Sequence, residues 1–319
     1  VAGVKGSLAR YDNGEWTRWQ FRYYENLRGI WGAGPDRVLV VGENGKSYRF
    51  DGDEWTAETT PVNRDIMSLW GAAWNDVWAV GEEGVILHWD GESWSSVVSP
   101  TTSLLYSVWG SGADDVFACG RDGVVLHWDG SAWTLQDTGT PHALDSIWGY
   151  GADDVFAVGA LGTILHWDGS AWSAEASGTS DRLWAVRGLP GNEPVALGAR
   201  GTFLTREGGV WSSEEVAAGS DLYGLWDDGD GALLVVGYNG LVMRLTNPAW
   251  QTINQGHTHW LTGILAADCD RVVAVGKRGT VLMSMGDGWV DIAPDVDGVD
   301  YAAIWGESPD DFFVVGSRG

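Results

Sequence analysis

The sequence predicts an all-β fold, an eight-bladed β-propeller with four-stranded blades of about 39 residues. Three observations support this prediction. Tryptophan returns every 39 residues, V-G-x-x-G motifs return with the same period, and no stretch shows a sustained helical spacing of apolar residues. The repeated tryptophans are Trp16, Trp55, Trp94, Trp133, Trp172, Trp211, Trp250 and Trp289. A repeat of this length that consists of strands is typical of a propeller blade.

Each repeat divides into four predicted strands. The division is clearest in residues 107–110, 115–118, 124–130 and 132–135, which are short runs rich in β-branched and aromatic residues. Gly and Asp turn signals separate them. A second series of residues marks the inner part of each repeat: Trp31, Trp70, Trp109, Trp148, Arg187, Trp226, Leu265 and Trp305.

The two ends of the chain are predicted to meet in one blade, because residues 314–319 repeat the pattern of residues 1–6. We expect residues 301–319 to supply the two inner strands of this blade and residues 1–20 its two outer strands. One domain would then span residues 1–319, as a monomeric ring without an open sheet edge. The alternative is a fragment of a longer repeat array.

Composition narrows the classes of partner. The formal net charge of −25 argues against nucleic acid, because phosphates require a cluster of Lys and Arg. No apolar run has the length of a membrane-spanning helix, so membrane insertion is not expected. Cys119 and Cys269 are predicted to lie four blades apart, which excludes a disulfide between them. No cofactor is expected.

Residues 107–120 (SVWGSGADDVFACG) and 125–133 (VLHWDGSAW) resemble a Trp-rich propeller repeat of bacterial envelope and secreted proteins, plentiful in myxobacteria. They are more distantly similar to BNR or Asp-box propellers and to photosystem II assembly-factor propellers. An Asp-box has Asp five residues before Trp, whereas Asp129 and Trp133 are four apart. The resemblance implies a propeller and a secreted or cell-envelope location in a bacterium, but no single activity.

Residues that recur in the blades are expected to be structural. The Trp series should pack between neighbouring sheets. His88, His127 and His166 occupy one position in three blades, too far apart for one metal ion, and are predicted to form hydrogen bonds. Arg187 replaces an inner Trp and is expected to be buried with polar partners. Turn capping is predicted for Asp76, Asp115, Asp154 and Asp311.

One variable position per blade is the best candidate for binding. It lies three residues before the inner Trp and is followed by a uniformly small residue, such as Gly29 or Ser107. Alternation along the strand directs the variable side chain away from the small residue, toward the central channel. Here we expect a ligand-binding collar of Arg28, Tyr106, Asp145, Trp184 and Tyr223. The alternative is that these residues line a wet channel without a ligand.

The loops between blades contain further aromatic and basic residues. They are suited to an anionic sugar, a peptide carboxylate or an acidic partner. The candidates are Tyr24, Arg64, His142, Arg182, His257 and His259. Asp295, Asp297 and Asp300 are spaced like calcium ligands, but the run is short and has no distal Glu, so no metal is predicted.

These observations favour a non-catalytic binding or scaffolding propeller with a protein partner. The first alternative is a glycan-binding module, because aromatic residues are frequent at the variable position. The second is a glycoside hydrolase or lyase of the Asp-box type. No catalytic set for such an enzyme can be assembled from the sequence.

Overall fold

The computed structural model describes residues 7–20, 26–189, 192–216, 219–227, 233–246, 249–253, 258–267, 271–284, 288–294 and 298–318. The fold is an all-β eight-bladed β-propeller, as predicted, and each blade is a four-stranded antiparallel sheet. The residues form two compact units. The first contains Val1–Gly42, Tyr48–Ala57 and Ser220–Gly319, and the second contains Glu43–Ser47 and Glu58–Gly219.

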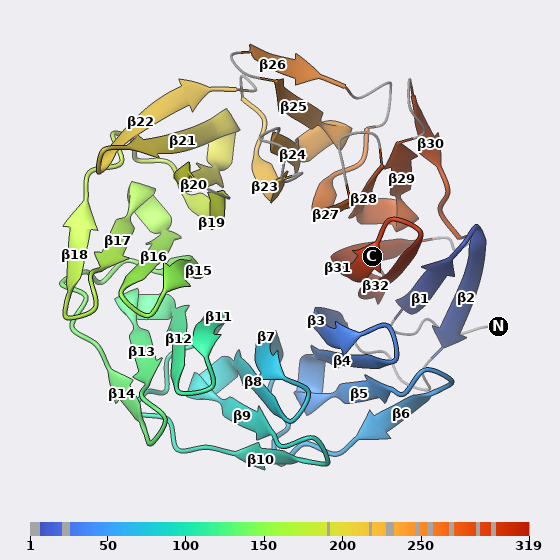
Figure 1. Ribbon diagram of the computed structural model, residues 1–319, viewed down its shortest axis with the longest axis horizontal. Coiled ribbons are helices and arrows are strands. Elements are labelled where there is room, and N and C mark those ends of the chain that lie inside the picture. Colours follow the sequence, from blue (N-terminus) through green and yellow to red (C-terminus); the bar gives the residue numbers. More distant parts are fainter. Residues whose placement is uncertain are drawn as a thin grey trace. The chain divides into compact units, whose positions relative to one another are not determined.

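The second unit holds the four blades β7–β10, β11–β14, β15–β18 and β19–β22 (Figure 1). In each blade the strands pair in chain order. The strands are β7 (Ile66–Ala73), β8 (Asp76–Gly81), β9 (Ile86–Trp89), β10 (Trp94–Ser96), β11 (Leu105–Gly112), β12 (Asp115–Gly120), β13 (Val125–Trp128), β14 (Trp133–Leu135), β15 (Leu144–Gly151), β16 (Asp154–Gly159), β17 (Ile164–Trp167), β18 (Trp172–Glu175), β19 (Leu183–Leu189), β20 (Asn192–Gly198), β21 (Thr202–Glu207) and β22 (Val210–Glu215).

The first unit holds most of blade β3–β6, the blades β23–β26 and β27–β30, and a blade shared by the two ends of the chain. Its strands are β1 (Ser7–Asp12), β2 (Glu15–Gln20), β3 (Leu27–Gly34), β4 (Arg37–Gly42), β5 (Ser47–Phe50), β6 (Trp55–Glu58), β23 (Leu222–Asp227), β24 (Leu233–Gly237), β25 (Val242–Thr246), β26 (Ala249–Thr252), β27 (Leu261–Ala266), β28 (Val272–Gly276), β29 (Val281–Ser284), β30 (Trp289–Asp291), β31 (Val299–Ser308) and β32 (Asp311–Arg318).

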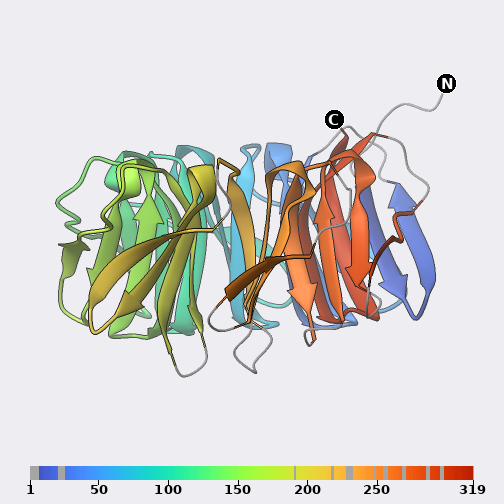
Figure 2. The same ribbon diagram turned by 90° about the horizontal axis from the view of Figure 1, so that it is seen from above.

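The predicted pairing of the two chain ends is confirmed. Strand β1 pairs antiparallel with β32 over six residues, from Ser7 opposite Gly316 to Asp12 opposite Asp311. The two strands lie side by side in Figures 1 and 2, and the sheet order is β2-β1-β32-β31. The N-terminal strands are therefore the outer half of a blade whose inner half is C-terminal, as expected.

The Trp-Gly pairs of the inner series pack from one blade to the next. Within the second unit, the ring of Trp70 covers Gly110 so closely that a Cβ there would lie 2.7 Å from it. Trp109 covers Gly149 in the same way. In the first unit, Trp305 covers Gly32. A side chain on these glycines would overlap the indole, which explains why Gly follows Trp in the repeat.

The outer Trp series also packs between sheets, as predicted. Trp133 is 6% exposed, and its ring lies 5.3 Å from that of Trp78 in the preceding blade. Trp172 makes an equivalent edge contact with Phe117. Arg187, however, is exposed, so the prediction of a buried guanidinium at that position is wrong. Its side chain reaches solvent, so the guanidinium stays hydrated and burial of a charge is avoided.

In the seven blades whose strands are consecutive in the chain, the second and third strands meet at a tight hairpin, V-G-x-x-G in most copies, that contains a short 3₁₀ turn. The described turns are η1 (Glu43–Gly45), η2 (Glu82–Gly84), η3 (Arg121–Gly123), η4 (Ala160–Gly162), η5 (Ala199–Gly201), η6 (Tyr238–Gly240) and η7 (Lys277–Gly279). Each packs against the loop that enters an innermost strand; the Lys277 N–H, for example, donates to the Trp260 carbonyl at 2.8 Å. These hairpins therefore lie beside the loops that join successive blades.

Candidate functional site

The variable position of each blade is the extra residue of a β-bulge in its innermost strand. In blade β11–β14, Leu105 pairs with Gly120 and Ser107 pairs with Cys119, so Tyr106 has no partner on β12. The same irregularity recurs in all eight innermost strands. We call these residues the bulge positions: Arg28, Met67, Tyr106, Asp145, Trp184, Tyr223, Thr262 and Ala302. A bulge redirects a side chain, so one backbone geometry presents eight different side chains.

The residue after each bulge is small because neighbouring atoms crowd its Cα. A Cβ at Gly224 would lie 2.8 Å from a methyl group of Val236, and one at Gly263 would lie 3.1 Å from a methyl group of Ile304. This packing explains why the residue after the variable position is small in every repeat. The bulge itself was not predicted, because strict alternation gives every strand residue a partner.

In the second unit, three predicted site residues come together. The Arg182 guanidinium binds the Asp145 carboxylate through two hydrogen bonds, with Nε 2.8 Å from Oδ2. It also lies over the Trp184 ring, 4.7 Å from the centroid. The hydrogen bonds that Arg182 donates to Asp145 raise the pKa of Arg182, and the electrostatic effect of Tyr106 adds to this shift. Asp145 and Trp184 are bulge positions of successive blades, and Arg182 contacts both of them.

In the first unit, the bulge position Tyr223 stacks on Trp260, with ring centroids 6.2 Å apart and an interplanar angle of 20°. Tyr238 from η6 packs against the same indole at 5.1 Å. Desolvation, followed by the nearby Asp221 carboxylate, raises the pKa of Tyr223 to about 12. Trp260 directly precedes β27, as Arg182 directly precedes β19, and both reach the bulge position of the preceding blade.

Sequence reasoning missed Trp260 and Tyr238. Neither belongs to a repeated series, and the other repeats hold different residues at the equivalent positions. One feature of the sequence could have pointed to Trp260. Trp260 follows Tyr223 by the same number of residues as Arg182 follows Asp145.

An open pocket of about 580 Å³ lies beside Trp260 in the first unit. It is lined by Thr258, His259, Trp260, Lys277, Arg278 and Asp300. The Lys277 ammonium donates to Asp300 Oδ2 at 2.8 Å, and the backbone N–H of Arg278 donates to Asp300 Oδ1 at 3.0 Å. Burial raises the pKa of Asp300, but these contacts outweigh it and the net shift is downward. The pocket thus combines an indole face with basic groups.

The other predicted loop residues are dispersed. Arg64 forms an ion pair with Glu83 on the surface. His142 contacts the Thr163 hydroxyl through Nδ1, and His259 contacts Thr280 in the same way. Arg28 lies at the bulge position of β3 and is partly buried. Four candidates lie outside the described residues: Tyr24, His257, Asp295 and Asp297.

The repeated His and Asp residues hold strands together. His88, His127 and His166 each contact the Asp that begins the second strand of the same blade, at 2.7 to 2.8 Å. Arg10 makes the equivalent ion pair with Asp311. The predicted hydrogen-bonding role of the histidines is confirmed. The aspartates bind the third strand of the blade, and Asp115 also accepts a hydrogen bond from the Ser111 hydroxyl of the preceding turn, so turn capping stays a prediction for the others.

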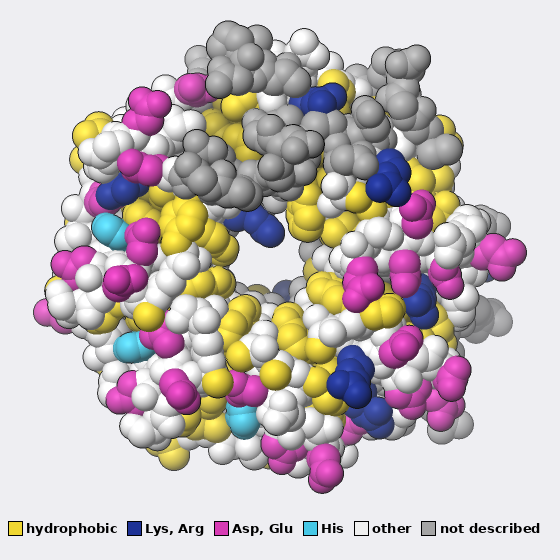
Figure 3. Space-filling model, in the orientation of Figure 1, with side chains coloured by type: hydrophobic (Ala, Val, Ile, Leu, Met, Phe, Trp, Pro, Cys, Tyr) yellow, Lys and Arg dark blue, Asp and Glu magenta, His cyan; other side chains and the backbone are white. Residues whose placement is uncertain are grey.

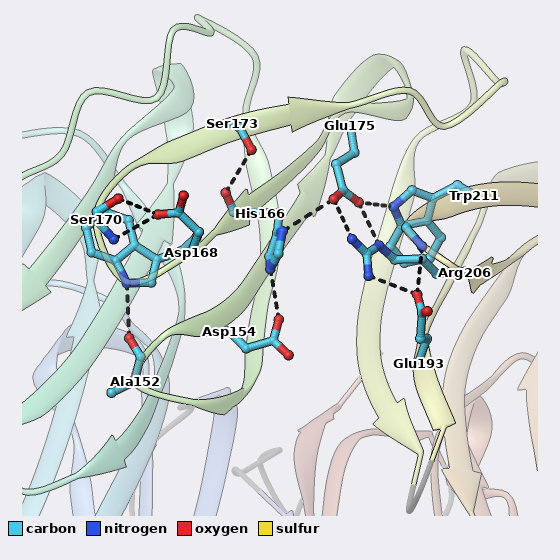
Figure 4. A network of polar contacts seen from close by, with 12 residues as sticks. Ala152, Asp154, His166, Asp168, Ser170, Ser173, Glu175, Glu193, Arg206 and Trp211 are labelled. Carbon is cyan, nitrogen blue, oxygen red and sulfur yellow. Dashed lines mark hydrogen bonds and ion pairs between the residues drawn. The ribbon is translucent and has the colours of Figure 1, made fainter.

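Figure 4 shows a polar network of the second unit that extends this arrangement to the next blade. Glu175 accepts hydrogen bonds from both Arg206, at 2.7 and 3.0 Å, and the Trp211 indole, at 2.6 Å. Arg206 also binds Glu193, and His166 approaches Glu175 at 3.3 Å. Burial raises the pKa of Glu175, but its donors produce a net lowering. These groups join two blades, and their opposite charges face one another.

Within the described ranges, no group of three or more His, Cys, Asp or Glu residues is placed to hold a metal ion. Cys119 is a buried free thiol with a raised pKa, caused by desolvation, and Cys269 lies outside the described residues. None of the helices described could cross a membrane. Acidic side chains are spread over the face that Figure 3 shows.

No protein-family model and no curated protein matches the chain. Solved structures do. The chain is similar to "YCF48 bound to D1 peptide" at 20% identity, with a TM-score of 0.61, covering 80% of this chain and 89% of that chain. It is similar to YCF48 from Cyanidioschyzon merolae at 14% identity, with a TM-score of 0.62 and 97% of each chain covered. The C-terminal WD40 domain of Sif2 gives 11% identity, a TM-score of 0.72, and coverage of 93% and 97%.

What these structures share with this chain is the propeller fold. The similarity to YCF48 agrees with the predicted distant resemblance to photosystem II assembly-factor propellers. Membership of the Trp-rich myxobacterial family stays a prediction. Because all three identities are below 25%, the binding properties of these proteins do not transfer with the fold.

Proposed function

We propose that this chain is a non-catalytic propeller that binds a protein partner through its bulge positions and the loops beside them. One observation carries the proposal. All eight innermost strands keep the same bulge, while the residue on the bulge ranges from Ala302 to Asp145 and Trp184. A backbone feature kept for packing alone would not need such different side chains, whereas a surface that contacts an asymmetric partner would.

The chemistry of the bulge positions suits a peptide. Tyr106, Trp184 and Tyr223 are partly exposed aromatic residues, the type that dominates protein interfaces. Trp184 is held by the Arg182 guanidinium, and Tyr223 by the Trp260 ring. Rings that are already fixed lose little conformational entropy on binding. The structure of YCF48 bound to D1 peptide supports the idea that a propeller of this kind can carry a peptide.

The absence of catalysis is part of the proposal. The best-connected titratable groups, such as His166 with Asp154 and Glu175 with Arg206, link strands and blades. The His–Asp contact occurs in three successive blades with nearly the same distance. Repetition of one contact in several blades favours a structural role, because a catalytic set is needed at one place.

A glycan is the second candidate ligand. The Trp260 indole is 42% exposed, and Thr258 and His259 line the pocket beside it. Exposed indoles with nearby polar groups are suited to stacking on sugar rings. Location in the envelope or outside the cell remains a proposal taken from the resemblance of the repeats.

The test compares arrays of internal peptide segments and of glycans, probed with two variants. The first replaces Tyr106, Trp184 and Tyr223 by Ala. The control replaces Val98, Leu135 and Val210 by Ala, which removes exposed apolar side chains away from the bulges. We expect the wild type and the control to bind the same peptides, and the first variant to lose them with a similar Tm.

Binding of glycans alone would replace the proposal with its alternative. Equal peptide binding by all three proteins would move the site away from the bulge positions. Turnover of a glycan or peptide by the wild type would show that the protein is an enzyme.

A further inference from the structure

The pocket beside Trp260 carries a net positive charge on a strongly acidic protein. Its lining holds two basic side chains, Lys277 and Arg278, and one carboxylate, Asp300. The whole chain has a formal charge of −25. A local excess of one positive charge in such surroundings selects a small anion, because a highly charged partner would be repelled by the rest of the surface.

The carboxylate of this pocket, Asp300, binds the hairpin through both of its oxygens. Asp300 accepts from Lys277 with one oxygen and from the Arg278 backbone N–H with the other. Asp65 occupies the equivalent position before another innermost strand, where it accepts the backbone N–H of Asn44 at 3.0 Å. The Asp300 contact with the hairpin is therefore structural, and each carboxylate oxygen keeps one further lone pair for solvent or a ligand.

Lys277 and Arg278 still have N–H groups that no acceptor among the described residues engages. The Lys277 ammonium has three N–H groups, of which Asp300 engages one. Within the described part of the chain, the Arg278 guanidinium has no acceptor in hydrogen-bond range, and the side chain is exposed. Arg278 stands at the hairpin tip with φ of 57°, a left-handed conformation that is uncommon for a residue with a side chain. An arginine in this position offers a planar pair of donors that matches a carboxylate.

The indole is the second half of the site. Trp260 lines the pocket, is 42% exposed, and is backed by Tyr223 and Tyr238. The contacts with these two rings fix its orientation. A flat apolar group can therefore stack on Trp260 while an attached anion reaches the basic hairpin.

We propose that this pocket binds the terminal carboxylate of a peptide whose last residue is aromatic, a proposal that rests on the protein-binding function above. The carboxylate would lie against Lys277 and Arg278, and the terminal ring would stack on Trp260. A net charge of about +1 on the residues that line the pocket favours a monoanion over a phosphate dianion. A sugar acid carries the same charge, but its hydroxyl-rich ring offers less apolar area to Trp260 than an aromatic side chain does.

The test uses synthetic ligands and calorimetric titration of the full chain at low ionic strength. The probe is acetyl-glycyl-tryptophan with a free carboxylate, and its C-terminal amide differs only in charge. We expect the amide to bind about tenfold more weakly or worse, because a charge-assisted hydrogen bond is lost. Acetyl-glycyl-alanine with a free carboxylate should also bind about tenfold more weakly.

Two variants and a control locate the site. Arg278→Gln and Trp260→Leu should each weaken the free acid by about tenfold. Arg200→Gln is the matched control, because Arg200 occupies the same hairpin position in the second unit, with φ of 56°, and forms an ion pair with Asp181. Its affinity should equal that of the wild type.

Equal affinity for acid and amide would overturn the proposal, and this comparison requires no variant. So would unchanged binding by Arg278→Gln, or the absence of any binding by the wild type at millimolar peptide. Tighter binding of glucuronate than of the peptide acid would assign the pocket to sugar acids. If internal peptides still bind at the bulge positions in the array, the proposed function survives and only the carboxylate pocket fails.

Discussion

Arg182 binds the Asp145 carboxylate of the preceding blade, across a separation of 37 residues. Trp260 reaches Tyr223 of its preceding blade across the same separation, but by stacking. In both cases the residue just before an innermost strand contacts the bulge position one blade earlier. The scaffold therefore couples two variable positions, and a change at one alters the surroundings of the other.

This coupling gives the first prediction. Replacing Asp145 by Asn and Arg182 by Met, singly and together, should show a favourable interaction of about 1 kcal/mol in a double-mutant cycle. The value is modest because Arg182 is 38% exposed, while Asp145 is 12% exposed. The measurement is the free energy of unfolding in urea. Additive effects of the two changes would show that the ion pair does not stabilise the blade contact.

The second prediction concerns two glycines in β11. Gly110→Ala should lower the free energy of unfolding by roughly 1 to 3 kcal/mol, because the new Cβ overlaps the Trp70 ring and the Asp115 carbonyl. Gly112→Ala is the matched control, since no atom lies within 4 Å of the position of its Cβ. Its stability should differ from that of the wild type by less than about 0.5 kcal/mol. Equal losses would contradict the packing explanation of the Trp-Gly repeat.

The third prediction concerns the outer tryptophans. Trp133→Ala should cost about 3 to 5 kcal/mol, because the indole is 6% exposed and fills the space against Trp78 and Trp128. Trp133→Phe should recover part of this loss, since it keeps an aromatic ring at the contact. A loss below about 1 kcal/mol for Trp133→Ala would show that the outer series does not carry blade packing.

Most of the fold could be predicted from the sequence because the sequence contains eight copies of the same blade pattern. The spacing of Trp133 and its equivalents set the period, and the match between the two chain ends indicated the shared blade, which β1 and β32 form. Repetition also identified His127 as structural, as its contact with Asp115 shows. Each of these features repeats along the sequence, so period and spacing were sufficient to find them.

The site could be predicted only in part. Variation at the bulge positions was visible, but the bulge itself depends on how β11 pairs with β12, which a periodic pattern does not reveal. The clusters around Arg182 and Trp260 arise from contacts between neighbouring blades that occur once each. Arg187 was assigned to the interior by its position in the series, yet it is exposed, because one blade can depart from the pattern without loss of the others.

The last prediction concerns the stability of the protein at low pH and the Asp-Gly turns that join the third and fourth strands. Asp129 accepts hydrogen bonds from the Ser131 hydroxyl and from the backbone N–H groups of Ser131 and Ala132, at 2.6 to 3.0 Å. These donors lower its pKa from 3.8 to about 2. Asp168 makes the same contacts in the next blade, with its pKa also lowered to about 2.

A carboxylate whose pKa is lower in the folded state stabilises the fold above the unfolded pKa, near 4, and loses this effect as pH falls through the folded value. The Tm of the wild type should therefore exceed that of Asp129→Asn at pH 7, and the difference should shrink from pH 4 toward pH 2. The other carboxylates contribute equally to the stability of both proteins, so their effect cancels in the comparison. Glu92→Gln, which removes an exposed charge from the equivalent turn of β9 and β10, should change the stability at pH 7 by less than about 0.5 kcal/mol. A difference between wild type and Asp129→Asn that stayed constant down to pH 2 would mean that the ionised carboxylate does not hold the turn.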